Sequence, residues 1–246
     1  MRRLEYLFLG ASPLMFAVQP AMAQEMEAQP AAVERAADDI VVTAQKREQS
    51  LQDVPISIAV VTGEALSDFH AKDMADIAAS VPNLFVERLN AADVIYIRGF
   101  GSAPSNFAFD QSVSLYQDGI YAGRGKQFEA PFFDIERIEV LRGPQGALFG
   151  KNTPAGAISI VTANPTSQFE AGITGTYNFD LKGPEFTGYV SGPVTDNLGV
   201  RLAVKALDLG GYIPNRTTGK RDPRRNQTLA RLTLQYENEG FDATAK

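Results

Sequence analysis

The last third of the chain alternates apolar and polar residues, and this pattern restricts the fold more than any other feature. In "VRLAVKA" (200–206) the even positions are apolar, whereas the odd positions carry an arginine, an alanine and a lysine. The segments 172–180 and 229–236 alternate in the same way, and 185–192 does so more weakly. Because successive side chains of a strand point to opposite faces, each segment predicts a strand with one apolar and one polar face.

The connections between these segments alternate in length. "PVTDN" (193–197) is short, whereas "GGYIPNRTTGKRDPRRNQ" (210–227) is long. Amphipathic strands of about 10 residues, joined by short and long connections in turn, are typical of outer-membrane β-barrels. A soluble antiparallel sheet with one solvated face gives the same alternation of residues, so the strands alone leave both folds open.

The N-terminus favours the membrane fold. Two arginines precede an apolar stretch from about Leu7 to Val18, and Ala21-Met22-Ala23 fits the small-x-small rule for signal cleavage. Pro13 and the short apolar stretch argue against a spanning helix. Residues 1–23 are therefore predicted to be a signal peptide for the general secretion route; the alternative is an ordinary buried N-terminal helix.

Residues 24–53 are mostly polar and are predicted to be a disordered leader. An isolated apolar pentamer interrupts them, and its five residues are Ile40, Val41, Val42, Thr43 and Ala44. So short a segment cannot bury itself in a flexible leader. It is either a stray edge strand or a segment that adds to the sheet of another protein.

Residues 54–165 are predicted to form a compact α+β domain with a small sheet and short helices. Strands are expected at 55–61, 84–88, 94–99, 113–123 with a turn at Asp118-Gly119, 135–143 and 157–162. Thr62 is a suitable cap for a short helix, and "KDMADIAASVP" (72–82) has apolar residues at helical spacing before its final proline.

The composition offers few catalytic groups. The chain has no cysteine and one histidine, which excludes disulfides, thiol catalysis and zinc sites built on cysteines or paired histidines. That histidine, His70, lies in "SDFHAKDMAD", which is typical of a polar helix surface. The net charge of −6 gives no support for nucleic-acid binding. No catalytic residue, metal ligand or cofactor is therefore expected.

The glycine-rich segment "GPQGALFGKN" (143–152) suggests a phosphate-binding loop, but its spacing is wrong. A Walker A loop has four residues between its glycines, followed by Lys and Ser or Thr. Here Gly146 and Gly150 enclose three residues, Gly143 and Gly150 enclose six, and Asn152 follows the lysine. An NTP-dependent enzyme is therefore disfavoured, and the glycines indicate tight turns beside a bulky neighbour.

Four segments of the chain resemble TonB-dependent outer-membrane receptors, in the order found in that family. They are "DDIVVTAQKREQSLQDVPISIAVVTGEAL" (38–66), "VIYIRGFG" (94–101), "VSLYQDGIYAGR" (113–124) and "IERIEVLRGPQGALFGKNTPAGAISIVT" (135–162). The resemblance implies a plug domain of mixed sheet and short helices at 54–165. It is followed at 166–246 by about four or five antiparallel strands that begin a transmembrane β-barrel.

The resemblance also implies a function, which is energy-coupled uptake of a scarce substrate, most often an iron–siderophore, across the bacterial outer membrane. Ile40–Ala44 match the TonB box, the segment that pairs as an added strand with the periplasmic domain of TonB. Arg98 and Arg142 match plug arginines that pair with carboxylates of the barrel wall. The expected substrate-facing residues are Phe100, Asn106, Phe107, Phe109, Tyr116 and Tyr121. No bond is made or broken in such uptake, so the protein is not expected to be an enzyme.

A complete barrel of about 22 strands needs several hundred residues more than follow the plug here. We therefore expect this chain to be the N-terminal part of a receptor, unable to transport by itself. The alternative is an autonomous secreted or periplasmic module that binds a ligand without a channel.

Overall fold

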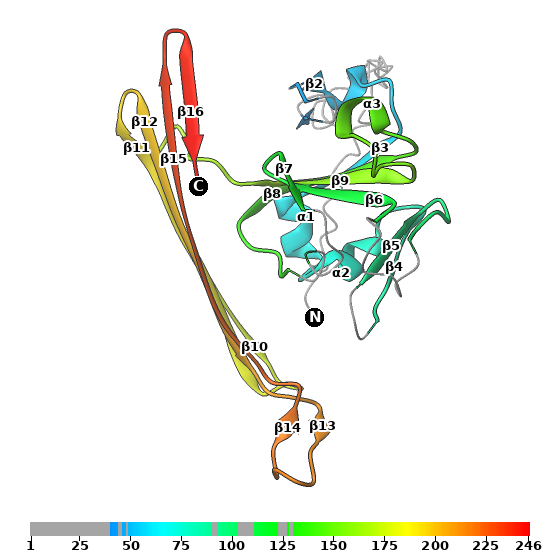
Figure 1. The fold of residues 1–246 in the computed structure, drawn as a ribbon. Coiled ribbons are helices and arrows are strands. Elements are labelled where there is room, and N and C mark those ends of the chain that lie inside the picture. The colour runs from blue at the N-terminus through cyan, green and yellow to red at the C-terminus, as the bar shows by residue number, and fades with distance from the viewer. Residues whose placement is uncertain are drawn as a thin grey trace, which may run out of the picture.

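The computed structural model describes residues 40–43, 46–47, 49–89, 93–102, 111–122, 127 and 130–246. The predicted signal peptide lies outside them. The described chain has two parts that stand side by side, a mixed α+β domain and a tall sheet of long strands (Figure 1). The first corresponds to the predicted plug domain and the second to the predicted barrel strands.

The plug domain is built on a five-stranded mixed sheet of order β3-β8-β9-β6-β7. These strands are β3 (Ile58–Thr62), β8 (Ile135–Arg142), β9 (Gly156–Thr162), β6 (Val113–Gln117) and β7 (Ile120–Ala122). β6 and β9 run parallel, and the other neighbours are antiparallel. A separate hairpin joins β4 (Leu84–Glu87) to β5 (Val94–Ile97). The predicted α+β domain with a small sheet is confirmed.

Short helices cover this sheet, and their ends follow the expected capping chemistry. They are η1 (Leu51–Asp53), α1 (Gly63–Asp68), α2 (Met74–Ala78) and α3 (Gly146–Phe149). The Thr62 hydroxyl accepts a hydrogen bond from the amide of Ala65 and so caps α1, as predicted. Met74 and Ile77 of α2 are 1% exposed and belong to the main core cluster, which also contains residues of β8 and β9.

The glycine-rich segment forms the connection between β8 and β9. Gly143 and Gly150 have φ of 99° and 86°, in the left-handed region that favours glycine. A Cβ on Gly156 would lie 2.3 Å from the Leu141 carbonyl oxygen, so the chain passes too close there for any side chain. The predicted tight turns are therefore present, and the four-residue α3 lies between them.

The second part is a five-stranded antiparallel sheet of order β10-β11-β12-β15-β16, hereafter the wall sheet. Its strands are β10 (Glu170–Asn178), β11 (Gly183–Thr195), β12 (Leu198–Leu209), β15 (Arg225–Asn238) and β16 (Phe241–Ala245). The long connection between β12 and β15 carries a small hairpin of β13 (Ile213–Pro214) and β14 (Arg221–Asp222). In the described chain, β10 and β16 form the two edges of the wall sheet.

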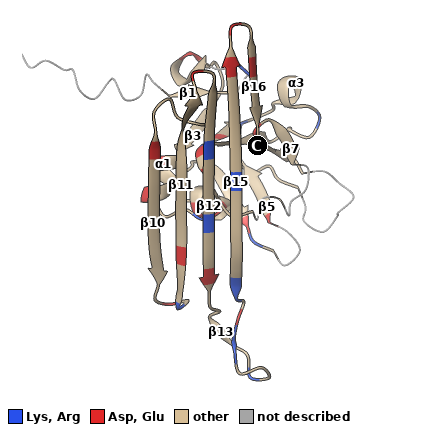
Figure 2. Cartoon of the chain, turned by 90° about the vertical axis from the view of Figure 1, so that its left-hand side faces the viewer, with Lys and Arg blue, Asp and Glu red and all other residues tan. Residues whose placement is uncertain are grey.

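The faces of the wall sheet follow the alternation seen in the sequence. Leu202 and Val204 of β12 are 46% and 41% exposed on the outer face, whereas Arg201 and Lys205 are both 8% exposed on the face toward the plug domain. Figure 2 shows β12 with two bands of positive charge. An exposed apolar face opposite a polar inner face is the arrangement expected of barrel strands in a membrane. Among the described residues, no helix has the length and apolar character needed to cross a membrane.

Candidate functional site

Part of the segment predicted to be a disordered leader is structured. β1 (Val41–Val42) pairs antiparallel with β2 (Gln49–Ser50), and the amide of Leu51 donates to the Ile40 carbonyl oxygen over 2.8 Å. Val42 is fully buried among plug residues that include Leu141 and Phe149. The predicted partner-binding pentamer is thus an extended segment held against the plug domain; its last residue, Ala44, lies outside the described residues.

A buried carboxylate holds this segment in place. Glu139 of β8 is 0% exposed, and its Oε1 accepts hydrogen bonds from the Thr43 amide at 2.8 Å and the Thr43 hydroxyl at 3.1 Å. Arg137 Nε donates to the same oxygen over 2.9 Å. The other oxygen, Oε2, is buried with no hydrogen-bond partner in the described chain. Glu139 is therefore a site residue that the sequence reasoning did not identify.

One signal in the sequence could have pointed to it. In "IERIEVLRG" (135–143) a glutamate stands between Ile138 and Val140 of a strand whose middle is apolar. A charge at such a place must either reach solvent or find partners, because an unpaired buried charge is costly. The sequence did not show that its partner would be Thr43, 96 residues earlier.

The two predicted plug arginines both have their guanidinium groups near the end of β8. Arg142 donates weakly to the carbonyl oxygens of Pro82 and Ile58, at 3.4 and 3.3 Å, and its Nε is buried without a partner. The Arg98 guanidinium lies 3.5 Å from the Cβ position of Gly143, the next residue after Arg142. In the part of the chain that is described, neither arginine has an ion-pair partner. Their pairing with barrel carboxylates stays a prediction.

The predicted substrate-facing residues are placed in different environments. Phe100 is 70% exposed at the end of the β4–β5 hairpin. Tyr116 is 8% exposed and lies in the same buried cluster as Val42, and burial raises the pKa of its phenol. Tyr121 packs on Tyr116 at 5.5 Å between ring centroids and accepts a hydrogen bond from Asn152.

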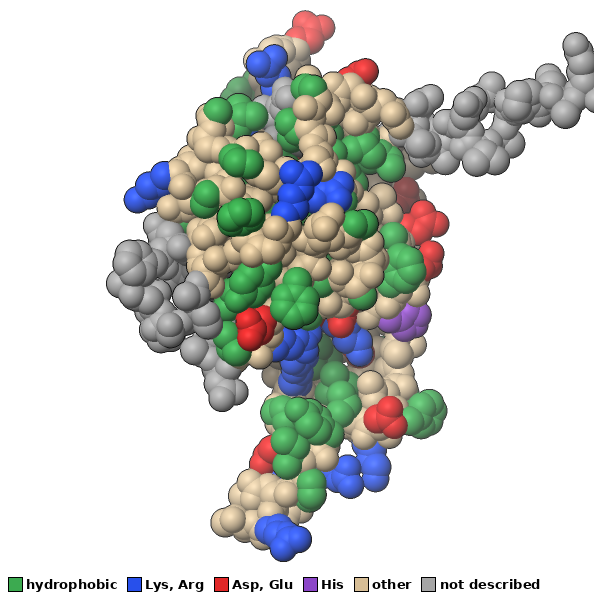
Figure 3. Space-filling model, turned by 90° about the vertical axis from the view of Figure 1, so that its right-hand side faces the viewer, with side chains coloured by type: hydrophobic (Ala, Val, Ile, Leu, Met, Phe, Trp, Pro, Cys, Tyr) green, Lys and Arg blue, Asp and Glu red, His purple; other side chains and the backbone are tan. Residues whose placement is uncertain are grey.

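Tyr116 thus lies beside the predicted partner-binding segment, which differs from the outward position expected for it. Asn106, Phe107 and Phe109 lie outside the described residues. Figure 3 shows the face of the plug domain turned away from the wall sheet, where apolar side chains are scattered among polar ones.

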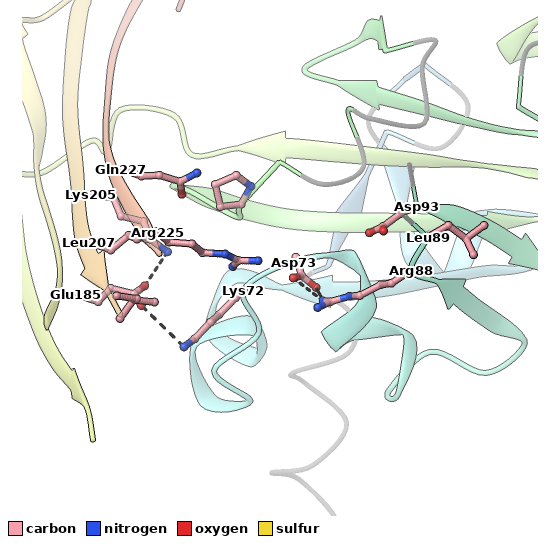
Figure 4. Close-up of a pocket in the computed structure, with 12 residues that line it drawn as sticks. Lys72, Asp73, Arg88, Leu89, Asp93, Glu185, Lys205, Leu207, Arg225 and Gln227 are labelled. Atoms are coloured by element: carbon pink, nitrogen blue, oxygen red, sulfur yellow. Dashed lines mark hydrogen bonds and ion pairs between the residues drawn. The ribbon is translucent and has the colours of Figure 1, made fainter. Parts of the chain in front are cut away.

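A cavity of about 400 Å³ lies between the plug domain and the wall sheet (Figure 4). Arg88 contacts both carboxylate oxygens of Asp73 at 2.5 and 2.6 Å. Across the cavity, Glu185 pairs with Lys205 at 2.8 Å and more distantly with Lys72 at 4.0 Å. These ion pairs form much of the polar lining of the cavity, so it offers charged contacts.

The histidine of the chain and its acidic side chains were the candidates for catalytic or metal-binding groups. His70 is exposed, and its Nδ1 lies 3.1 Å from the carbonyl oxygen of Asp68. Within the ranges that the structure describes, no group of three or more His, Cys, Asp or Glu side chains is placed to hold a metal ion.

Comparisons with known proteins agree with this geometry. The family model of the TonB-dependent receptor plug domain matches residues 50–157. The pesticin receptor of Yersinia pestis is 32% identical over 191 residues, which cover 70% of this chain and 28% of that protein. The vitamin B12 transporter of Vibrio vulnificus is 33% identical over 137 residues, covering 53% of this chain and 21% of that protein.

Solved structures give the same result. The ferric yersiniabactin uptake receptor FyuA of Yersinia pestis has a TM-score of 0.62 at 26% identity, over 75% of this chain and 29% of that chain. The pyoverdine outer-membrane receptor FpvA of Pseudomonas aeruginosa has a TM-score of 0.68 at 20% identity, over 83% of this chain and 29% of that one, and supports the fold alone.

The chain spans less than a third of the length of these relatives. They are receptors and transporters. FpvA is named as an outer-membrane receptor, and an iron-regulated outer membrane virulence protein of Vibrio cholerae is 30% identical over 67% of this chain, in agreement with the predicted location. Residues 50–157 are therefore a TonB-dependent receptor plug domain, and the chain is related to the outer-membrane receptors that carry it.

Proposed function

We propose that this chain acts in the energy-coupled uptake of a scarce substrate across the bacterial outer membrane, with Ile40–Ala44 as the segment that TonB engages. One observation carries the proposal: residues 40–43 are extended, and their strand pairing with the plug domain is only two residues long, supplemented by the bonds from Thr43 to Glu139 and the burial of Val42. An extended segment with so few backbone partners is suited to leave the plug and to pair with the edge of another sheet.

The substrate class follows from the relatives and is proposed on that basis. Those with 30% identity or more include the ferric-pyoverdine 358 receptor of Pseudomonas putida and the vitamin B12 transporter of Vibrio vulnificus. A ferric siderophore is the class that we propose, with Phe100 among the residues facing it. Transport of this kind makes and breaks no bond, so the proposed function needs no catalytic residue. Arg98 and Arg142 are proposed to pair with carboxylates of the barrel wall.

A pull-down with the periplasmic domain of TonB tests the proposal. Val42→Pro removes a backbone donor from the pairing strand and should abolish capture. Val42→Thr keeps the backbone N–H and the branched side chain, so it is the matched control and should be captured like the parent. Equal capture of the proline variant and the control would disprove the assignment of the segment.

The alternative function, a soluble binding module, is distinguished by the location of the expressed chain. A receptor segment should fractionate with outer-membrane lipid, because Leu202, Leu232 and similar residues expose an apolar face. Recovery of folded chain in the soluble periplasmic fraction would favour the module.

A further inference from the structure

Three consecutive plug residues are held by cations of the wall sheet, and we call this contact the joint. The plug side is Phe132, Phe133 and Asp134, which lead into β8. The wall side is Arg201 and Lys205 of β12 and Arg231 of β15. Every residue of the joint belongs to the described chain.

The centre of the joint is a buried ion pair between Asp134 and Arg201. Arg201 Nη2 and Nε lie 2.6 and 3.0 Å from Asp134 Oδ1, and Nε also lies 3.2 Å from Oδ2. The two side chains are 5% and 10% exposed. The guanidinium lies 4.2 Å over the Tyr189 ring, which helps to fix its orientation. Charge-assisted contacts of this kind are strong and directional.

The backbone of the same plug segment is held as well. Arg231 Nη1 donates to the Phe133 carbonyl oxygen at 2.7 Å and more weakly to that of Asp134 at 3.3 Å. Lys205 Nζ donates to the Phe132 carbonyl oxygen at 3.3 Å. The Ala163 amide donates to the Asp134 carbonyl oxygen at 2.9 Å, so the joint adjoins the point where the chain leaves β9 for the wall sheet.

We propose that Asp134 is the positioning residue that seats the plug on the wall sheet, through the cations of β12 and β15. A buried carboxylate without its cation is strongly disfavoured, whereas the pair adds little net stability over apolar packing. The joint therefore selects one placement of the plug over others. In the joint the wall sheet supplies the cations and the plug supplies the anion. The pairing predicted for Arg98 and Arg142 has the opposite arrangement, with cations on the plug and anions on the wall.

Spin labels on the full 246-residue chain test this proposal. The chain has no cysteine, so Ala79→Cys in the plug and Ala230→Cys in β15, both exposed, give a unique labelled pair. Double electron–electron resonance in detergent micelles should give one narrow distance distribution for the parent. Arg201→Met should broaden it, and Arg201→Lys, which keeps the charge but loses the two-pronged contact, should give an intermediate width.

The matched control is Arg224→Met, which removes an arginine from an exposed ion pair with Asp208 and should leave the distribution narrow. Far-UV circular dichroism shows whether Arg201→Met keeps its strands. If it does not, Asp134→Asn, which leaves the wall sheet unaltered, decides the matter: a broad distribution supports the proposal. A broad distance distribution in the parent would overturn the proposal. So would a narrow distribution in a folded Arg201→Met variant or, where that variant loses its strands, in Asp134→Asn.

Discussion

The plug domain makes two contrasting attachments, one to the segment proposed to bind TonB (residues 40–43, hereafter the box segment) and one to the wall sheet at the joint. The box segment is held by a two-residue strand pair, by two hydrogen bonds from Thr43 to a carboxylate and by the burial of one side chain, that of Val42. The joint combines three cations of the wall sheet, one of which forms a buried ion pair with Asp134. It also lies next to the point where the chain itself passes from β9 to the wall sheet. The first attachment is suited to release and the second to permanence, so a pull on the N-terminus would be resisted at the joint.

The largest expected effect comes from breaking the joint. Asp134→Ala leaves Arg201 buried without its carboxylate, and breaking one partner of a buried pair typically costs about 3–5 kcal/mol. Urea unfolding followed by circular dichroism should show this loss. Asp208→Ala, which breaks the exposed pair with Arg224, is the comparison and should change the midpoint little. If Asp134→Ala lowered the urea midpoint as little as Asp208→Ala does, the joint would be no stronger than an exposed ion pair, and its contrast with the box segment would be lost.

A smaller effect is expected at the box segment. Thr43→Val keeps the size of the side chain and the amide but loses the hydroxyl bond to Glu139, which contributes about 0.5–1.5 kcal/mol. Hydrogen exchange of the Val42 and Thr43 amides should quicken by roughly two- to tenfold. Thr43→Ser restores the hydroxyl and should exchange like the parent. Unchanged exchange in Thr43→Val would mean that the hydroxyl bond to Glu139 does not help to retain the segment.

The smallest effect is expected at a third contact, where Lys246 Nζ donates to Asp118 at 3.0 Å and to the Thr162 hydroxyl at 2.6 Å. Burial acts to raise the pKa of Asp118, but hydrogen bonds from Thr162 and Lys246 outweigh it, so the pKa lies below its ordinary value of about 4. A lowered pKa in the folded state means that this carboxylate stabilises the fold above that value and loses its contribution as pH falls through the folded pKa.

Urea midpoints at neutral and acid pH measure this contribution. The parent should lose a modest part of its stability between about pH 5 and the folded pKa, and Lys246→Met should reduce that loss. Equal acid sensitivity in the two proteins would show that other carboxylates govern this range.

The sequence predicted the elements of both regions better than their contacts. Alternation in β12 placed Arg201 and Lys205 on one face and Leu202 and Val204 on the other, because side-chain direction in a strand depends only on position. The caps and tight turns were predictable for the same local reason. The choice of Asp134 for Arg201, 67 residues away, depends on how the domains pack, and no local pattern encodes it.

The same limit explains Tyr116 and Glu139. Both belong to short strand patterns that were recognised, but their environments are made by Val42 and Thr43, residues that were expected to lie in a flexible leader. Because Val42 packs in the same cluster, Tyr116 is buried, although it was expected to face a ligand.

The two-residue period of β12 has a consequence for how this protein tolerates insertions and deletions. One residue inserted between Leu198 and Arg201 would turn Arg201 and Lys205 to the apolar outer face and separate them from the plug. Two inserted residues would preserve the faces and move the cations along the strand by about 7 Å. Insertions or deletions of two residues in this strand should therefore be tolerated better than those of one residue. In the long connection between β12 and β15, whether the number is odd or even should not matter.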